Sequence, residues 1–200
     1  MKSKHEARTK FRQARRTLDP STKASNEKRI ADFLFAWIGQ TFEHGDLVAL
    51  YSSMPNTGEV QTTLLHERLA GQYPMCYPKV LGRTMAFHRV HHLEDLTPGF
   101  KGVPEPVIAD AVSLSRISLI IVPGVAFTAS GMRLGQGGGH YDRLLGSLGL
   151  NAVTIGLAHD VQITEQLPTE ASDKTVDGII SENGWIKEPD RDQPALAASA

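Results

Sequence analysis

Apolar positions in the first forty residues recur at helical spacing. A narrow apolar stripe is formed at i, i+4, i+7 and i+11 by Ala7, Phe11, Ala14 and Leu18. This spacing predicts a helix over residues 3–18. Asp19 and Pro20 are typical of the start of a second helix, as N-cap and first helical residue. The wider apolar face of that second helix comprises Ile30, Phe33, Leu34, Trp37 and Ile38.

Beyond residue 45, short apolar runs alternate with helical segments. The predicted strands are 46–52, 72–77, 84–90, 117–122, 151–158 and 176–181, and the predicted helices are 59–69 and 140–148. The Pro- and Gly-rich segment 96–106 predicts a loop. Strands that alternate with helices favour an α/β fold with a mostly parallel sheet. We expect one domain over residues 1–186, followed by a mobile tail over residues 187–200.

Composition narrows the class of protein. The chain has 200 residues, 40% apolar and 22% charged, which fits one globular domain and excludes wholesale disorder. A single cysteine, Cys76, excludes an internal disulfide and a cysteine zinc cluster, and fits a reducing compartment. The sequence has no apolar run of a transmembrane helix and no secretory signal. We therefore expect a cytoplasmic protein without a membrane partner.

Charge is unevenly distributed along the chain. The net charge is −1, yet ten of the 21 Lys and Arg residues precede residue 30, opposed there only by Glu6, Asp19 and Glu27. Such asymmetry indicates an anionic partner for this end, such as a nucleotide phosphate or a nucleic acid. The alternative is a basic helix face that is simply solvated.

The glycine-rich segment 123–143 carries the candidate chemistry. It reads PGVAFTASGMRLGQGGGHYDR, and its later glycines lead directly into a predicted helix, where backbone N–H groups attract anions. Arg133 precedes these glycines and is placed to bind phosphate, while Asp142 in the first helical turn is placed to hold Mg²⁺. The Walker pattern is absent, and the dinucleotide fingerprint fails because residue 140 is His.

The run RLGQGGGHYDR resembles the RLGxGxGYYD signature of the 5-formyltetrahydrofolate cyclo-ligases, also called methenyltetrahydrofolate synthetases. Other segments match that family in the same order along the chain: Lys4 with Arg8, 51–62, 102–106, 123–127, Leu167 with Pro168, and Asp173 with Asp177. Because these segments agree in both order and spacing, the resemblance covers nearly the whole chain.

The resemblance implies a three-layer α/β/α sandwich with a mostly parallel sheet, of the kind shared with NagB, ribose-5-phosphate isomerase and CoA transferases. It implies an ATP- and Mg²⁺-dependent ligase that converts 5-formyltetrahydrofolate to 5,10-methenyltetrahydrofolate and releases ADP and phosphate. The formyl oxygen would be phosphorylated and N10 would then close the ring. Its partners would be reduced folate and ATP, with no nucleic acid, and a monomer is expected.

The resemblance also assigns roles to residues. ATP would be held by Lys4, Arg8, Arg133, Leu134, Gly135, Gln136, Gly137, Gly138, Gly139, His140 and Tyr141. The folate would be held by Met54, Glu59, Gln136, Gly137, Gly138, Gly139 and His140. Magnesium would be held by Asp142 and Asp173, and the catalytic residues would be Arg133, Tyr141 and Asp142.

The sequence departs from the family pattern on the folate side. His140 stands where the family has the first Tyr of a Tyr–Tyr pair, and Gln136 takes a position that is often aromatic or basic. Two alternatives stay open: a noncatalytic nucleotide- or RNA-binding relative, and a ligase for another formyl or pterin substrate. Glu59 has an alternative role as a charge at a helix start, and Asp173 as a turn residue.

Overall fold

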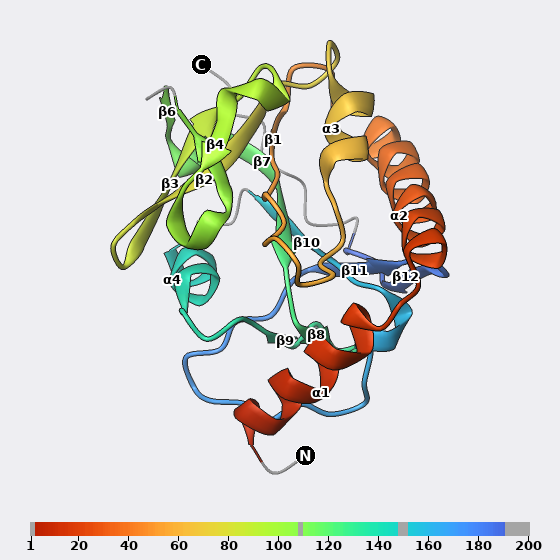
Figure 1. Ribbon diagram of the computed structural model, residues 1–200. Helices are drawn as coiled ribbons and strands as arrows, with labels where there is room; N and C mark the ends of the chain where they lie inside the picture. Colours follow the sequence, from red (N-terminus) through yellow and green to blue (C-terminus); the bar gives the residue numbers. More distant parts are fainter. Residues whose placement is uncertain (1–2, 108–109, 148–151, 191–200) are drawn as a thin grey trace.

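An eight-stranded sheet forms the centre of the computed structural model, which describes residues 3–107, 110–147 and 152–190 (Figure 1). The strand order is β12-β11-β10-β7-β1-β2-β3-β6. These strands are β1 (Leu47–Ala49), β2 (Met75–Leu81), β3 (Thr84–Arg89), β6 (Ala111–Val112), β7 (Ile117–Pro123), β10 (Val153–Leu157), β11 (Gly178–Ser181) and β12 (Gly184–Lys187). Pairing is parallel from β11 to β2, and β12, β3 and β6 add antiparallel edges. The predicted α/β fold with a mostly parallel sheet is confirmed.

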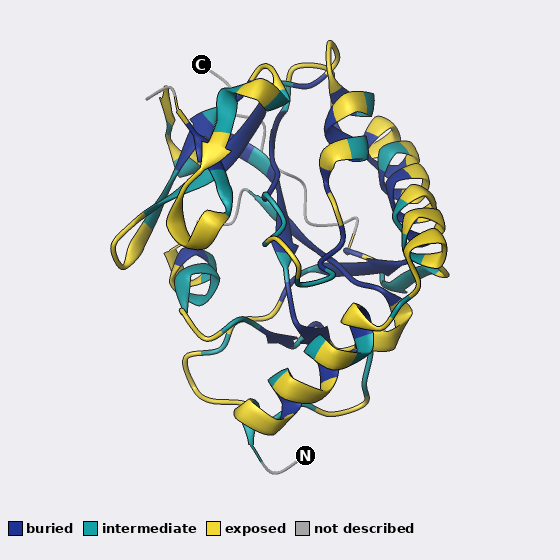
Figure 2. Cartoon of the chain, in the orientation of Figure 1, coloured by how far each residue is buried: buried dark blue, intermediate teal, exposed yellow. Residues whose placement is uncertain are grey.

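Helices lie on both faces of this sheet. α2 (Pro20–Thr41) and α3 (Thr63–Leu69) cover one face, and α4 (His140–Ser147) lies on the other (Figure 1). Alternate strand residues supply the two cores: Val48, Leu119 and Ile121 pack with α2, whereas Ala49, Ile120 and Val122 share a cluster with Leu144 of α4. Figure 2 shows the buried strands between the exposed outer helix surfaces. In these described residues, no helix combines the length and apolarity needed to cross a membrane.

The first helix docks at one end of the sheet. α1 (Lys4–Arg16) buries Ala7 and Phe11 against the segment that contains Val125, Ala126 and Leu134. That segment forms a small antiparallel hairpin of β8 (Ala126–Phe127) and β9 (Arg133–Leu134). The predicted apolar stripe thus determines which side of α1 faces the glycine-rich segment (Figure 1).

The predicted helix over residues 59–69 begins later, at Thr63. The residues before it are held by the segment that follows β1 instead. The Tyr51 hydroxyl donates to the Val60 carbonyl at 2.7 Å, and the Thr62 hydroxyl donates to the Tyr51 carbonyl at 2.5 Å. Because these contacts fix an irregular backbone, Glu59 lies in a loop rather than in a helix.

Several short elements escape the sequence prediction. The predicted loop 96–106 contains an antiparallel pair, β4 (Leu96–Pro98) and β5 (Pro104–Pro106). β12 also went unpredicted, and it includes Lys187, whose Nζ donates to the Val176 carbonyl at 2.8 Å. The predicted tail therefore does not start at residue 187, and residues 191–200 lie outside the described part. The remaining short helices are η1 (Leu93–Asp95), η2 (Phe100–Gly102), η3 (Leu114–Arg116) and η4 (Asp160–Gln162).

Stability should depend on pH through His159, which follows β10 and is fully buried. Burial, together with the charges of Lys23 and Arg15, lowers its pKa to about 4, whereas an unfolded histidine titrates near 6.5. As the pH falls through this window, His159 is therefore protonated in the unfolded chain but stays neutral in the folded chain. We expect this group to remove roughly 3 kcal/mol of unfolding free energy between about pH 7 and about pH 4.

Chemical denaturation of the protein and of a His159→Leu variant across this pH window isolates the histidine contribution from that of the carboxylates. The variant should show a shallower loss of stability toward acid pH. Parallel stability curves for the two proteins would contradict the account.

Candidate active site

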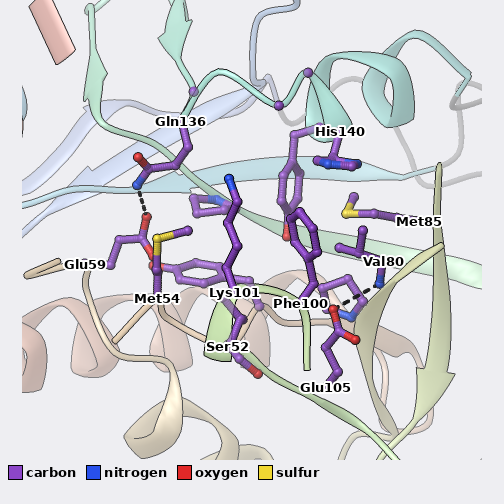
Figure 3. Close-up of a pocket in the computed structure, with 18 of the residues that line it drawn as sticks. Ser52, Met54, Glu59, Val80, Met85, Phe100, Lys101, Glu105, Gln136 and His140 are labelled. Carbon is purple, nitrogen blue, oxygen red and sulfur yellow. Dashed lines mark hydrogen bonds between the residues drawn. The ribbon is translucent and has the colours of Figure 1, made fainter. Parts of the chain in front are cut away.

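A cavity of about 220 Å³ lies where the carboxyl ends of β1 and β7 meet the glycine-rich segment. Ligands in open α/β sheets bind at this edge. Of the residues predicted for the site, those that line the cavity are Met54, Glu59, Arg133, Gly135, Gln136, Gly138, Gly139, His140, Tyr141 and Asp142. Figure 3 shows Gln136 and His140 on one side, with Glu59 and Met54 across from Gln136. Lys4, Arg8, Leu134, Gly137 and Asp173 are described but are not lining residues.

The glycine-rich segment turns sharply before α4. Gly137 and Gly139 have φ angles of 105° and 65°, in the left-handed region that favours glycine. Their conformation brings the backbone directly into the N-terminus of α4 at His140. The sequence prediction of a glycine turn that leads into a helix is thereby confirmed.

The three predicted catalytic residues lie together. Arg133 Nη2 lies 2.6 Å from Asp142 Oδ1, and the Arg133 side chain is only 3% exposed. The Arg133 guanidinium lies 5.8 Å from the centroid of the Tyr141 ring. Arg133 Nε and the Tyr141 hydroxyl are buried without a hydrogen-bond partner in the described part of the chain. Because buried polar groups are normally satisfied, two orphaned groups beside one cavity indicate a place for a ligand.

One face of α1 directs four basic side chains inward. Lys4 Nζ lies 2.7 Å from Asp173 Oδ1 and 3.2 Å from Glu170 Oε2. Arg8 Nε donates to the Gly135 carbonyl at 2.9 Å. Arg12 and Arg15 extend this row to Gln136 and Glu59. The solvated-face alternative therefore holds only for the opposite side of α1.

Sequence reasoning missed Arg12 and Arg15. The available signal was the spacing of 4, 8, 12 and 15, which places these residues on one helix face. Arg15 is fully buried. Burial lowers its pKa, although the negative charge of Glu59 acts in the other direction. Its Nε and Nη1 donate to the carbonyls of Thr57 and Gly124 at 2.8 and 3.0 Å, so the side chain is fixed.

Glu59 lies in the cavity wall with a full set of donors. Its Oε1 accepts from Gln136 Nε2 at 2.8 Å and lies 3.5 Å from Arg15 Nη2. Its Oε2 accepts from the Met54 amide at 2.8 Å. Since α3 begins only at Thr63, the alternative role of Glu59 as a charge at a helix start is wrong.

The two predicted metal ligands differ in availability. Asp142 commits Oδ1 to Arg133, whereas Asp173 uses Oδ1 for Lys4 and Oδ2 for the Glu170 amide at 2.7 Å. Burial alone would raise the pKa of Asp173, but the hydrogen bonds from Lys4 and Glu170 and the charges of Lys4 and Arg133 lower it. The described residues contain no group of three His, Cys, Asp or Glu suited to a metal. Magnesium commonly takes one or two carboxylates plus substrate phosphates, so Asp142 fits this role.

Two aromatic rings, Phe100 and His140, also line the cavity. The rings of Phe100 and His140 contact edge to face, with centroids 6.2 Å apart. Burial and the charges of Arg143 and Lys101 lower the pKa of His140 below that of an ordinary histidine. Its imidazole is therefore neutral near pH 7. The sequence analysis singled out neither Phe100 nor Lys101, although an exposed aromatic between glycines was a usable signal.

Comparison with known proteins places this chain in a family. The model of the 5-formyltetrahydrofolate cyclo-ligase family matches residues 1–182. The 5-formyltetrahydrofolate cyclo-ligase of Escherichia coli strain K12 is 32% identical over 179 residues, which cover 86% of this chain and 96% of that protein. The enzyme of the same name from Haemophilus influenzae is 31% identical, with 84% of this chain and 91% of that protein covered.

A solved structure agrees with these sequence matches. The NMR structure of Aquifex aeolicus 5,10-methenyltetrahydrofolate synthetase superposes with a TM-score of 0.80 at 30% identity, and covers 98% of this chain and 95% of that one. Sequence and fold thus agree along most of the length, and the chain belongs to the 5-formyltetrahydrofolate cyclo-ligase family.

Proposed function

We propose that the protein converts 5-formyltetrahydrofolate to 5,10-methenyltetrahydrofolate with ATP and Mg²⁺, and releases ADP and phosphate. The observation that carries this proposal is one cavity lined both by the group of Arg133, Tyr141 and Asp142 and by Glu59. The first group suits a phosphate and its metal, and the carboxylate suits the N–H groups of a pterin ring.

The reaction asks the protein mainly to position two substrates. A formamide is unreactive because its nitrogen lone pair is delocalised into the carbonyl. Attack of the formyl oxygen on the γ-phosphorus of ATP forms an O–P bond and releases ADP, which leaves the formyl carbon electrophilic. N10 then bonds to that carbon and loses its proton, and the C–O bond breaks to release phosphate. Positioning and charge neutralisation supply most catalysis in phosphoryl transfer.

Basic side chains of the site would neutralise the phosphates. Arg133 is held in place by Asp142 and by the Pro123 carbonyl, which Nη1 reaches at 3.3 Å. Its Nε is buried without a hydrogen-bond partner, and a shift of the side chain toward the cavity would make it a further donor for phosphate. Lys4 and Arg8 would approach from α1, and Lys4 would exchange Asp173 for a phosphate oxygen. Asp142 would hold Mg²⁺, which supplies further neutralisation of phosphate charge when bound.

The folate would occupy the opposite half of the cavity. Glu59 would accept hydrogen bonds from the pterin amino and ring N–H groups, and its buried position strengthens such bonds. His140, neutral at pH 7, would pack on the flat ring, and Met54 would supply an apolar contact. The role of Asp173 as a ligand of Mg²⁺ stays a prediction. In the structure both of its carboxylate oxygens already accept hydrogen bonds, one from Lys4 and one from the Glu170 amide.

Release of ADP and phosphate tests the substrate directly. Purified protein would be mixed with Mg-ATP and, in turn, 5-formyltetrahydrofolate, 10-formyltetrahydrofolate and a formylated pterin without the glutamate tail. ADP release that requires 5-formyltetrahydrofolate would support the proposal. Equal or faster release with another formylated compound would favour a ligase with a different substrate.

We also propose that the chain works as a cytoplasmic monomer of one domain. The single cysteine, Cys76, is free and buried, which fits a reducing compartment, and burial raises the pKa of its thiol to about 12. The two large buried clusters lie on opposite faces of the same eight-stranded sheet, as expected for one domain. Light scattering after gel filtration should give a mass near 21.8 kDa, and twice that mass would contradict the monomer.

A further inference from the structure

One side chain of the glycine-rich segment joins helix α1 to the cavity wall. Gln136 Nε2 donates to Glu59 Oε1 at 2.8 Å (Figure 3). Gln136 Oε1 accepts from Arg12 Nε at 3.0 Å and from Arg12 Nη2 at 2.7 Å. A guanidinium only donates and a carboxylate only accepts, so both neighbours require the same orientation of the amide. A polar chain therefore runs from Arg12 of α1 through Gln136 to Glu59.

Glu59 retains other donors when Gln136 leaves. Arg15 Nη2 lies 3.5 Å from Oε1, and the Met54 amide donates to Oε2 at 2.8 Å. Arg15 is fully buried and is held by two backbone carbonyls, so it cannot move away easily. Gln136 is only half-buried. It is the donor that a ligand can replace without leaving a buried carboxylate unpaired.

Arg12 forms stronger hydrogen bonds to a phosphate than to the Gln136 amide. The amide oxygen of Gln136 is a neutral acceptor, and a phosphate offers charge-assisted and bidentate bonds that are stronger. Arg12 lies one helical turn from Arg8, whose Nε already contacts the glycine-rich segment at Gly135. A polyphosphate on this segment therefore competes with Gln136 for the half-buried Arg12 side chain.

We propose that Gln136 is a positioning residue that couples the two substrate sites. In the free protein, Gln136 is hydrogen-bonded to Glu59. When nucleotide phosphates bind Arg12, Gln136 loses its partner on α1 and moves away, and Glu59 can then bind the folate. This inference rests on the proposed function. It requires that nucleotide tightens folate binding, and by linkage that folate tightens nucleotide binding by the same factor.

Calorimetric titration of 5-formyltetrahydrofolate into the full chain, with and without a non-hydrolysable ATP analogue and Mg²⁺, tests the coupling. Wild type would be compared with Gln136→Met, which has similar length but neither donates nor accepts, and with Gln13→Met on the exposed side of α1. The analogue should lower the folate Kd of wild type and Gln13→Met by about fivefold or more. In Gln136→Met the change should be less than about twofold, because Glu59 is already released. In Arg12→Gln the folate Kd should likewise change little when the ATP analogue is added.

The dissociation constant without nucleotide is the most direct indicator. In Gln136→Met it should approach the wild-type value with nucleotide. A Kd ratio equal to that of wild type, or a weaker folate affinity without nucleotide, would overturn the proposed coupling, since a merely structural Gln136 would weaken both states equally. A wild type that binds no 5-formyltetrahydrofolate in either state would contradict the proposed function, and with it the coupling.

Discussion

Arg133→Ala is expected to lower kcat by about a thousandfold or more, which is the scale of losing an arginine that stabilises phosphoryl-transfer charge. The guanidinium is buried, fixed by Asp142 at 2.6 Å, and has an unpartnered Nε beside the cavity. Alanine removes this charge and leaves Asp142 without its partner, so the placement of Mg²⁺ would suffer as well. Steady-state ADP release at saturating ATP and folate measures the effect.

A matched substitution separates this effect from a general loss of basic charge. Arg116→Ala removes an exposed arginine from η3 and should leave kcat unchanged. Circular dichroism and thermal unfolding should show that Arg133→Ala keeps the fold, because Arg133 lies in the short hairpin β8–β9 and not in the eight-stranded sheet. A kcat for Arg133→Ala within about threefold of wild type would rule out the phosphate role, since the expected loss is far larger.

Glu59→Gln is expected to raise the KM for 5-formyltetrahydrofolate by about 10- to 100-fold, with little change in the KM for ATP. The amide has the same shape, and its oxygen still accepts from the protein, but the negative charge and one acceptor are lost. Hydrogen bonds to a charged group contribute about 1.5–3 kcal/mol, which corresponds to this range. Initial rates with each substrate varied in turn measure the two constants.

The separation between the substrates is the informative part of this result. Glu94→Gln on the exposed η1 helix serves as the control and should leave both constants unchanged. Thermal unfolding should be recorded because Glu59→Gln also leaves the buried Arg15 without its anionic neighbour. An equal rise of both KM values would indicate that Glu59 supports the site as a whole and does not contact folate.

Much of the fold could be predicted from local patterns. The run 117–122 is apolar except for Ser118 because both faces of β7 are covered, and the helix predicted over residues 3–18 shows its docking side through Ala7 and Phe11. The strand pair β4–β5 could not be predicted in the same way. Its residues carry no alternating pattern, and its pairing depends on contacts around Glu105, which accepts from the Val80 amide at 3.2 Å.

The site shows the same division. The glycine-rich segment and its neighbours Arg133 and Asp142 are local in sequence, so their spacing already predicted an anion site. The Arg12–Gln136–Glu59 chain joins residues up to 124 positions apart, and only the docking of α1 brings them together. The late start of α3 likewise depends on Tyr51, because its hydrogen bonds hold the backbone that carries Glu59 into the cavity wall.

Formation of the methenyl product is the measurement that tests the central claim most directly. The purified protein would be mixed with 5-formyltetrahydrofolate, ATP and Mg²⁺, and the near-ultraviolet absorbance of 5,10-methenyltetrahydrofolate would be followed. The account predicts an absorbance rise that requires all three components and that is lost with Arg133→Ala. No rise with the complete mixture, from folded protein that still binds ATP, would contradict it.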